Sequence, residues 1–166
     1  IGGTQLFSAE APGPASDKLH PRITDTAKRL WLIYLTYTIV QTVLLYIAGM
    51  TVFDAVNHAM STISTGGFST KSESIAFWDD KPLIQYIIIA FMFLAGTNFV
   101  LSYFAFKRKF QKIFQDEEFK LYTRFTIFFS LIVIIFILIS QNLPANSILN
   151  IIEPTARNAV FQVVSI

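Results

Sequence analysis

The run of hydroxyl and glycine residues between positions 62 and 70 has the most specific chemistry in the chain; it reads Thr-Ile-Ser-Thr-Gly-Gly-Phe-Ser-Thr. Its glycine pair permits backbone conformations with positive φ, and without side chains it lets carbonyl oxygens approach a small ligand closely. Ion filters are built from rings of backbone carbonyls that replace the hydration shell of a cation. We therefore predict a cation site in this loop. Its expected ligands, mainly through backbone carbonyls, are Ser64, Thr65, Gly66 and Gly67.

The composition indicates a membrane protein. Of the 166 residues, 53% are hydrophobic and only 14% are charged, whereas soluble domains average about 25% charged residues. The net charge of +2 is too small to indicate nucleic acid as a partner, and the lack of cysteine excludes disulfides and thiolate metal sites. The first residues, Ile1-Gly2-Gly3, include neither an initiator Met nor a signal peptide, so we expect a fragment of a longer protein.

Three apolar runs are long enough to cross a bilayer, which requires about 20 residues. They are Leu30 to Met50, Pro82 to Phe106 and Phe119 to Ser140. The segment from Phe53 to Thr62 has roughly half the required length, so it predicts a half-helix that ends at the glycine loop. Asp54 lies in its first turn, where a carboxylate is favoured, and its negative C-terminal end would favour a cation. The chain is therefore expected to be an all-α membrane protein.

The order of span, half-helix and loop begins again near the C-terminus, where the third span is followed by a short segment from Thr155 to Ile166. Several positions of this segment match the half-helix in register: Asn158-Ala159-Val160 with Asp54-Ala55-Val56, Gln162 with His58, and Ser165 with Ser61. This repetition predicts one complete unit and the start of another. The expected regions are a cytoplasmic linker at 1–25, a complete unit at 26–106, a second cytoplasmic linker at 107–118 and an incomplete unit at 119–166.

The distribution of charge predicts an orientation. Residues 107–124 carry six basic and three acidic side chains, whereas residues 51–81 carry two basic and four acidic ones. Because Lys and Arg are enriched in cytoplasmic loops, we expect the basic segments inside the cell and the glycine loop entering from outside. In this orientation Ala15 and Lys112 lie in the cytoplasm, and Glu73 and Asn146 lie outside.

Thr65-Gly66-Gly67-Phe68 can be aligned with the Thr-Val-Gly-Tyr signature of potassium-channel filters, with Gly66 in place of Val. The wider run from Phe53 to Thr70 resembles the second pore loop of the TrkH/KtrB family of potassium transporters, and it is most similar to the TrkH branch. The resemblance implies a channel-like repeat, potassium uptake across the bacterial inner membrane, and K⁺ as the transported ion with no other cofactor. The departure at Gly66 leaves a less selective K⁺/Na⁺ transporter as the alternative.

The resemblance also implies an assembly. Four such units would surround one pore, the complete subunit would form a homodimer in the lipid bilayer, and a cytoplasmic nucleotide-binding ring such as TrkA would dock on it. Three residues are expected to support the filter: Thr62, Phe68 and Asn98. Asn98 lies inside the second apolar run, where a polar side chain should face the pore or bond to a neighbouring helix. Gly96, nearby, is expected to be a close-packing site.

An enzyme would have to use Asp54, His58 and Ser61, which fall at i, i+4 and i+7 on one helical face. This spacing could hold a base near a hydroxyl nucleophile. With two histidines and no cysteine, a zinc site is hard to assemble. A passive membrane anchor would leave the half-helix and the glycine loop without a purpose. We therefore expect a transporter and no enzyme, with His58 in the packing of the half-helix.

Overall fold

The structure is a computed structural model that describes residues 23–140 and 148–166, and all regular elements in these residues are helices. The helices are α2 (Ile23–Ile47), α3 (Val52–Ile63), the short 3₁₀ helix η1 (Ser74–Trp78), α4 (Pro82–Ala95), α5 (Phe99–Phe106), α6 (Phe110–Gln115), α7 (Glu117–Ser140) and α8 (Ile148–Ser165). Most of the expected N-terminal linker, with Ala15, lies outside the described residues, as does Asn146.

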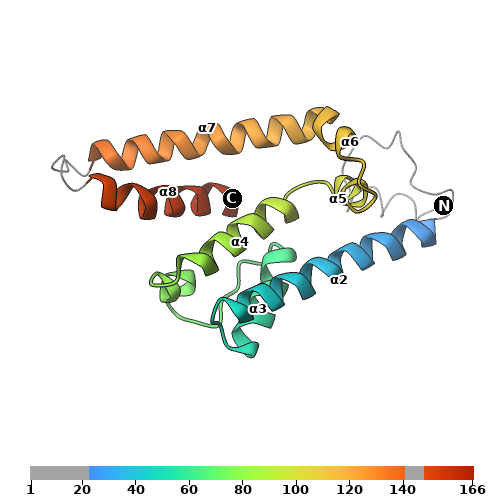
Figure 1. Cartoon of the computed structure of the whole chain (residues 1–166), viewed down its shortest axis with the longest axis horizontal. Helices are drawn as coiled ribbons and strands as arrows, with labels where there is room; N and C mark the ends of the chain where they lie inside the picture. The colour runs from blue at the N-terminus through green and yellow to red at the C-terminus, as the bar shows by residue number, and fades with distance from the viewer. Residues whose placement is uncertain (1–22, 141–147) are drawn as a thin grey trace.

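Helix α4 lies in the middle of the molecule (Figure 1). On one side it contacts α2 and α3, and on the other side it contacts α8, which in turn packs along α7. Each long helix is therefore followed by a shorter helix that folds back against it: α3 follows α2, and α8 follows α7. This arrangement agrees with the repeat expected from the sequence.

Two helices have the length and composition of membrane spans: Ala27–Ile47 within α2 and Glu117–Ile139 within α7. Only 17% of the first window and 6% of the second is buried inside the protein. A core helix of a soluble protein would be largely buried, so these exposed apolar surfaces belong in lipid or against further helices. The all-α membrane class is confirmed.

The first span ends in a tight turn that reverses the chain into α3. Gly49, with a φ of 102°, donates its N–H to the carbonyl of Tyr46 at 3.0 Å, and Met50 donates to the carbonyl of Leu45 at 3.1 Å. These two bonds form a Schellman motif, in which glycine adopts the left-handed conformation just after the helix. Thr51 then caps α3 by accepting a hydrogen bond from the N–H of Asp54. The span therefore ends near Gly49, as expected.

The second apolar run is not one helix, and the expectation of a continuous span from Pro82 to Phe106 is wrong. Helix α4 ends at Ala95, and α5 begins at Phe99. Between them, Thr97 donates both its N–H and its hydroxyl to the carbonyl of Leu94, at 3.2 and 2.7 Å. Thr and Asn side chains compete with helical hydrogen bonds for the local backbone, and they interrupt the helix here.

Other helix bounds also differ from the expected ones. Helix α2 begins at Ile23, inside the expected linker, and α6 lies within the second linker. Helix α7 begins at Glu117 because the carboxylate of Asp116 accepts a hydrogen bond from the N–H of Phe119 at 2.8 Å, which is a helix cap. Helix α8 starts before the expected segment and continues through Pro154.

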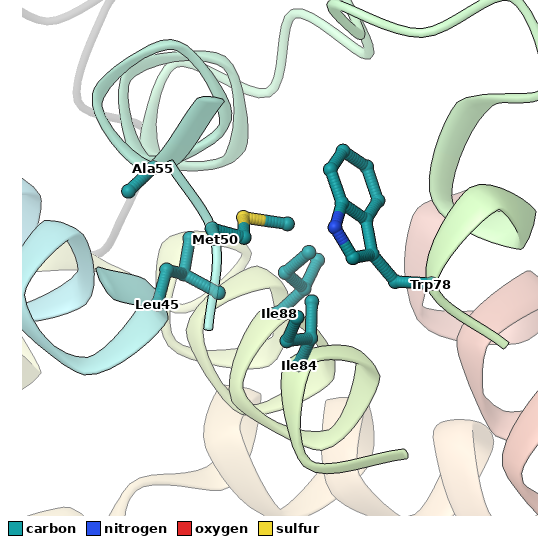
Figure 2. Close-up of a cluster of buried hydrophobic side chains, with 6 residues drawn as sticks. All are labelled: Leu45, Met50, Ala55, Trp78, Ile84 and Ile88. Carbon is teal, nitrogen blue, oxygen red and sulfur yellow. The ribbon is translucent and has the colours of Figure 1, made fainter. Parts of the chain in front are cut away.

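A hydrophobic cluster holds the first unit together (Figure 2). Its buried members come from α2, the following turn, α3, η1 and α4: Leu45, Met50, Ala55, Trp78, Ile84 and Ile88. Ala55 is fully buried, as is Ala159 at the matching position of α8 with 1% exposure. Small residues let helices approach closely. An alanine therefore lies at the packed face of both α3 and α8.

Candidate functional site: the loop after α3

Helix α3 delivers the glycine loop from its C-terminal end. The expected half-helix from Phe53 to Thr62 is confirmed, with one more residue at each end. The loop then turns back on the helix: Ser64 donates its N–H to Met60 at 3.0 Å, and Gly66 donates to Ser61 at 2.8 Å. The last carbonyls of a helix carry partial negative charge. The loop therefore lies at the helix end that favours a cation.

The backbone of the loop is unusual at two residues. Thr65 has a φ of 53° and Gly67 a φ of 68°, whereas Gly66 between them does not have a positive φ. A positive φ is rare for a β-branched residue and costs roughly 1–3 kcal/mol where it occurs. The sign of φ therefore alternates along the loop, from Thr65 through Gly66 to Gly67.

Three side chains on one face of α3 hold the segment that leaves the loop. They form three successive contacts: Ser61 Oγ accepts from the N–H of Phe68 at 2.6 Å, His58 Nε2 lies 3.1 Å from Ser69 Oγ, and Asp54 Oδ1 accepts from Thr70 Oγ1 at 2.5 Å. Consecutive residues of the return segment thus bond to positions i+7, i+4 and i of the helix. We call these contacts the three rungs.

His58 occupies the middle rung in a defined tautomer. Its Nδ1 lies 2.8 Å from the backbone carbonyl of Asp54, which can only accept, so Nδ1 carries the proton. In the neutral ring Nε2 is then the acceptor for the hydroxyl of Ser69. Trp78 packs edge-on against the imidazole, with ring centroids 5.1 Å apart. His58 is therefore a packing and hydrogen-bonding residue, as expected.

The same three residues do not form a Ser-His-Asp relay. The carboxylate of Asp54 bonds to the hydroxyls of Thr51 and Thr70, and the contact between His58 and Asp54 is to the backbone carbonyl of Asp54. Ser61 accepts a hydrogen bond from the loop backbone. The spacing that resembles a catalytic face is explained by the rungs.

Asp54 is the charged member of this framework. Its side chain is buried, and Lys71 Nζ lies 3.5 Å from Oδ2. The hydrogen bond from Thr70 lowers the pKa of the Asp54 carboxyl, with further contributions from Thr51 and Lys71 that together outweigh burial. Because the pKa is lowered, the carboxylate stabilises the fold at neutral pH and loses this effect only as the pH falls below the usual carboxyl range.

A cavity of about 570 Å³ opens beside the loop. On the loop side its lining includes Thr62, Thr65, Gly67 and Phe68. On the other side it includes Gly96, Tyr122, Ser165 and Ile166. Ser165 is the last residue of α8, and Ile166 follows it. The ends of both short helices therefore face one common space.

The structure separates the expected site residues into two groups. Among the described residues that line the cavity are two expected ligands, Thr65 and Gly67, but Ser64 and Gly66 do not line it. Asn98 does not line it either, because it caps α5 by accepting a hydrogen bond from the N–H of Val100 at 3.0 Å. The expectation that Asn98 lies inside a helix is wrong. Tyr122 also lines the cavity, and no motif in the sequence indicates this role.

The chain is similar to known proteins over nearly its whole length. The sequence model of the TrkH family, described as cation transport proteins, matches residues 1–165. The chain belongs to the TrkH family. It is 39% identical over 168 residues to the Trk system potassium uptake protein TrkH of Escherichia coli strain K12, covering 99% of this chain and 33% of that protein. To TrkH of Halomonas elongata it is 40% identical over 168 residues, covering 100% of this chain and 33% of that protein.

A solved TrkH structure shares the fold. The crystal structure of the potassium transporter TrkH from Vibrio parahaemolyticus superimposes with a TM-score of 0.80 at 32% sequence identity, over 96% of this chain and 33% of that one. This TrkH-family chain thus spans about a third of the length of these relatives. The cavity therefore represents only part of the surroundings of the loop in a complete subunit.

Close packing of Gly96 against the next unit leads to a prediction. A Cβ on Gly96 would lie 2.6 Å from the hydroxyl oxygen of Tyr122 and 3.2 Å from the adjoining ring carbon. Gly96→Ala should therefore destabilise the complete protein by about 1–3 kcal/mol, the usual cost of overpacking. Tyr122→Phe removes the nearest atom, so the double variant should recover most of this loss. Thermal melting in detergent measures both effects, and equal melting of the double variant and Gly96→Ala would contradict the contact.

Proposed function

We propose that this chain forms part of the ion path of a potassium uptake subunit and that the loop after α3 binds K⁺. The ligands are the backbone carbonyls of Ser64, Thr65, Gly66 and Gly67, with Thr62 and Phe68 as supporting residues. The observation that carries the proposal is the alternating sign of φ in this loop, at the C-terminal end of a half-buried short helix beside a cavity. The relatives named above are potassium uptake proteins.

The geometry favours carbonyl ligands over hydroxyl ligands. The hydroxyl of Thr65 donates to the carbonyl of Ser64 at 2.7 Å, and Ser64 Oγ lies 3.4 Å from the carbonyl of Ser61. Both hydroxyls are thus turned toward the chain itself. Rings of carbonyls are the usual ligands of K⁺ in filters. One loop supplies only part of a ring, so the complete site needs matching loops from other units.

A less selective K⁺/Na⁺ transporter is the second candidate, and Gly66 is the observation that favours it. A Cβ at this position would lie 3.1 Å from a ring carbon of Phe68 and 3.2 Å from Ser64 Oγ. The loop is thus packed without a side chain at the place where potassium channels carry Val. A filter that lacks this side chain has fewer contacts to fix its width.

Uptake by the complete subunit decides between these candidates. We expect the protein to restore growth at low potassium in bacteria that lack their own potassium uptake, and to take up K⁺ faster than Na⁺. Equal uptake of both ions would favour the second candidate. Uptake of neither ion, with the protein present in the membrane, would contradict both candidates.

The proposed location is the bacterial inner membrane, with the loop entering from outside. Cysteine labelling tests this orientation directly because the chain has no native cysteine. Glu73→Cys should react with a membrane-impermeant reagent applied to whole cells, and Lys112→Cys should react only after the membrane is opened. Both positions are exposed. Labelling of residue 112 from outside would reverse the orientation.

The proposed assembly is a homodimer of complete subunits bound to a TrkA-like nucleotide-binding ring in the cytoplasm. Its support is the relatives, which are named as parts of a Trk system. Asn98 remains a proposed support residue of the filter, and as the cap of α5 it would act through the position of the helix break.

A further inference from the structure

Helix α2 contacts α5 (Figure 1). Cationic side chains from the two segments meet there on Tyr103. Arg29 donates a hydrogen bond from its guanidinium to the hydroxyl of Tyr103. The guanidinium carbon also lies 5.3 Å from the centroid of the Tyr103 ring, and the ammonium of Lys107 lies 4.8 Å from the same centroid. Two positive charges from different helices therefore share one aromatic side chain.

The carboxylates that the structure describes do not neutralise these charges. Among the side chains that the structure describes, no carboxylate forms an ion pair with Arg29, Lys107, Arg108 or Lys109. Like charges held close together repel each other, and an anion between them would relieve this repulsion. Arg29 uses one terminal nitrogen on Tyr103. A guanidinium carries further N–H groups and binds a phosphate in a forked geometry.

An exposed apolar stripe runs along α2 from this cluster. Leu32, Ile39 and Val43 are 60%, 54% and 50% exposed. Their spacing from Arg29 is 3, 10 and 14 residues, which places all four on one side of the helix. Trp31, which precedes Leu32 and is 65% exposed, has the amphipathic character of residues at the level of lipid head groups. A cationic head and an apolar stripe together match the shape of a phospholipid.

We propose that Arg29, Lys107 and Tyr103 bind the phosphate of an anionic phospholipid, whose acyl chain lies along the stripe on α2. A lipid is favoured over a soluble partner because the charges lie at the end of a membrane span and continue into surface that only lipid or apolar protein covers. Basic pockets between membrane helices bind anionic head groups in this way.

Native mass spectrometry of the complete protein, purified in detergent and supplied with phosphatidylglycerol or phosphatidylcholine, tests the site. We expect retention of phosphatidylglycerol only. In Arg29→Gln/Lys107→Gln its affinity should fall about 30-fold, the effect of removing two basic residues from a membrane surface. The matched control is Lys120→Gln/Arg124→Gln, which removes two exposed basic residues from α7 and should retain the lipid.

Tyr103→Phe provides a milder variant that keeps both charges but releases Arg29 from its hydrogen bond; we expect a severalfold loss. Equal retention of both lipids, or equal loss in the two double variants, would overturn the proposal. Displacement of phosphatidylglycerol by millimolar inorganic phosphate would also overturn it, since the site would then recognise free phosphate.

Discussion

Gly67→Ser is expected to weaken the preference for potassium over sodium about tenfold while the protein still inserts into the membrane. Gly67 has a φ of 68°, and a Cβ there would meet nothing within 4 Å. The effect is therefore conformational strain of roughly 1–3 kcal/mol, without a steric clash. About 1.4 kcal/mol changes an equilibrium ratio tenfold, so strain of this size is enough to disturb the balance between two ions. Uptake of both ions by the complete subunit measures the ratio.

Gly49→Ser is the matched control because Gly49 also has a positive φ, of 102°. A Cβ there would lie 3.1 Å from Lys81 Nζ, the end of a flexible side chain. We expect a similar loss of stability from backbone strain but an unchanged ratio of potassium to sodium uptake. If the two variants kept the same wild-type ratio, the loop would have no part in selectivity.

Asp54→Ala should loosen the loop more than any other single change in the rungs. It leaves Thr70, Thr51 and Lys71 without their acceptor. Removing one partner of a buried ion pair costs about 3–5 kcal/mol, but Lys71 is 33% exposed and recovers part of this in water. We expect a loss of about 2–4 kcal/mol by thermal melting, together with at least tenfold slower uptake. Asp54→Asn keeps one acceptor oxygen, so its loss of stability and of uptake should be smaller than that of Asp54→Ala.

Asn57→Ala is the control on the exposed side of α3. The side chain of Asn57 bonds within its own helix, to the carbonyl of Phe53 at 2.7 Å. Its removal should change stability by less than about 0.5 kcal/mol and leave uptake unchanged. Similar melting for Asp54→Ala and Asn57→Ala would show that the contact between Asp54 and Thr70 does not support the loop.

The parts of the fold that depend on hydrophobic length were predictable from the sequence. The first and third spans and the half-helix follow from the lengths of their apolar runs, and the turn at Gly49 follows from the conformational freedom of glycine. The break between α4 and α5 was not predictable in the same way. The run is apolar on both sides of it, and the interruption depends on hydrogen bonds of Thr97 and Asn98 within a few residues.

The candidate site was predictable in its location but not in its supports. The glycine pair indicates the loop, yet the three rungs pair residues that are 7, 11 and 16 positions apart. Such pairs depend on how the return segment folds back. The helical pattern alone shows only that Asp54, His58 and Ser61 share one face of the helix. Tyr122 reaches Gly96 from the following unit, a contact that only tertiary structure establishes.

The most direct test of the central proposal is to locate the ion. Crystals of the complete subunit grown with rubidium, which scatters anomalously and replaces potassium, would show where the ion binds. We expect an anomalous peak within coordination distance of the carbonyls of residues 64–67, and a weaker peak when sodium competes. A peak at the Thr65 or Ser64 hydroxyls, or no peak at this loop, would contradict a carbonyl-lined site after α3.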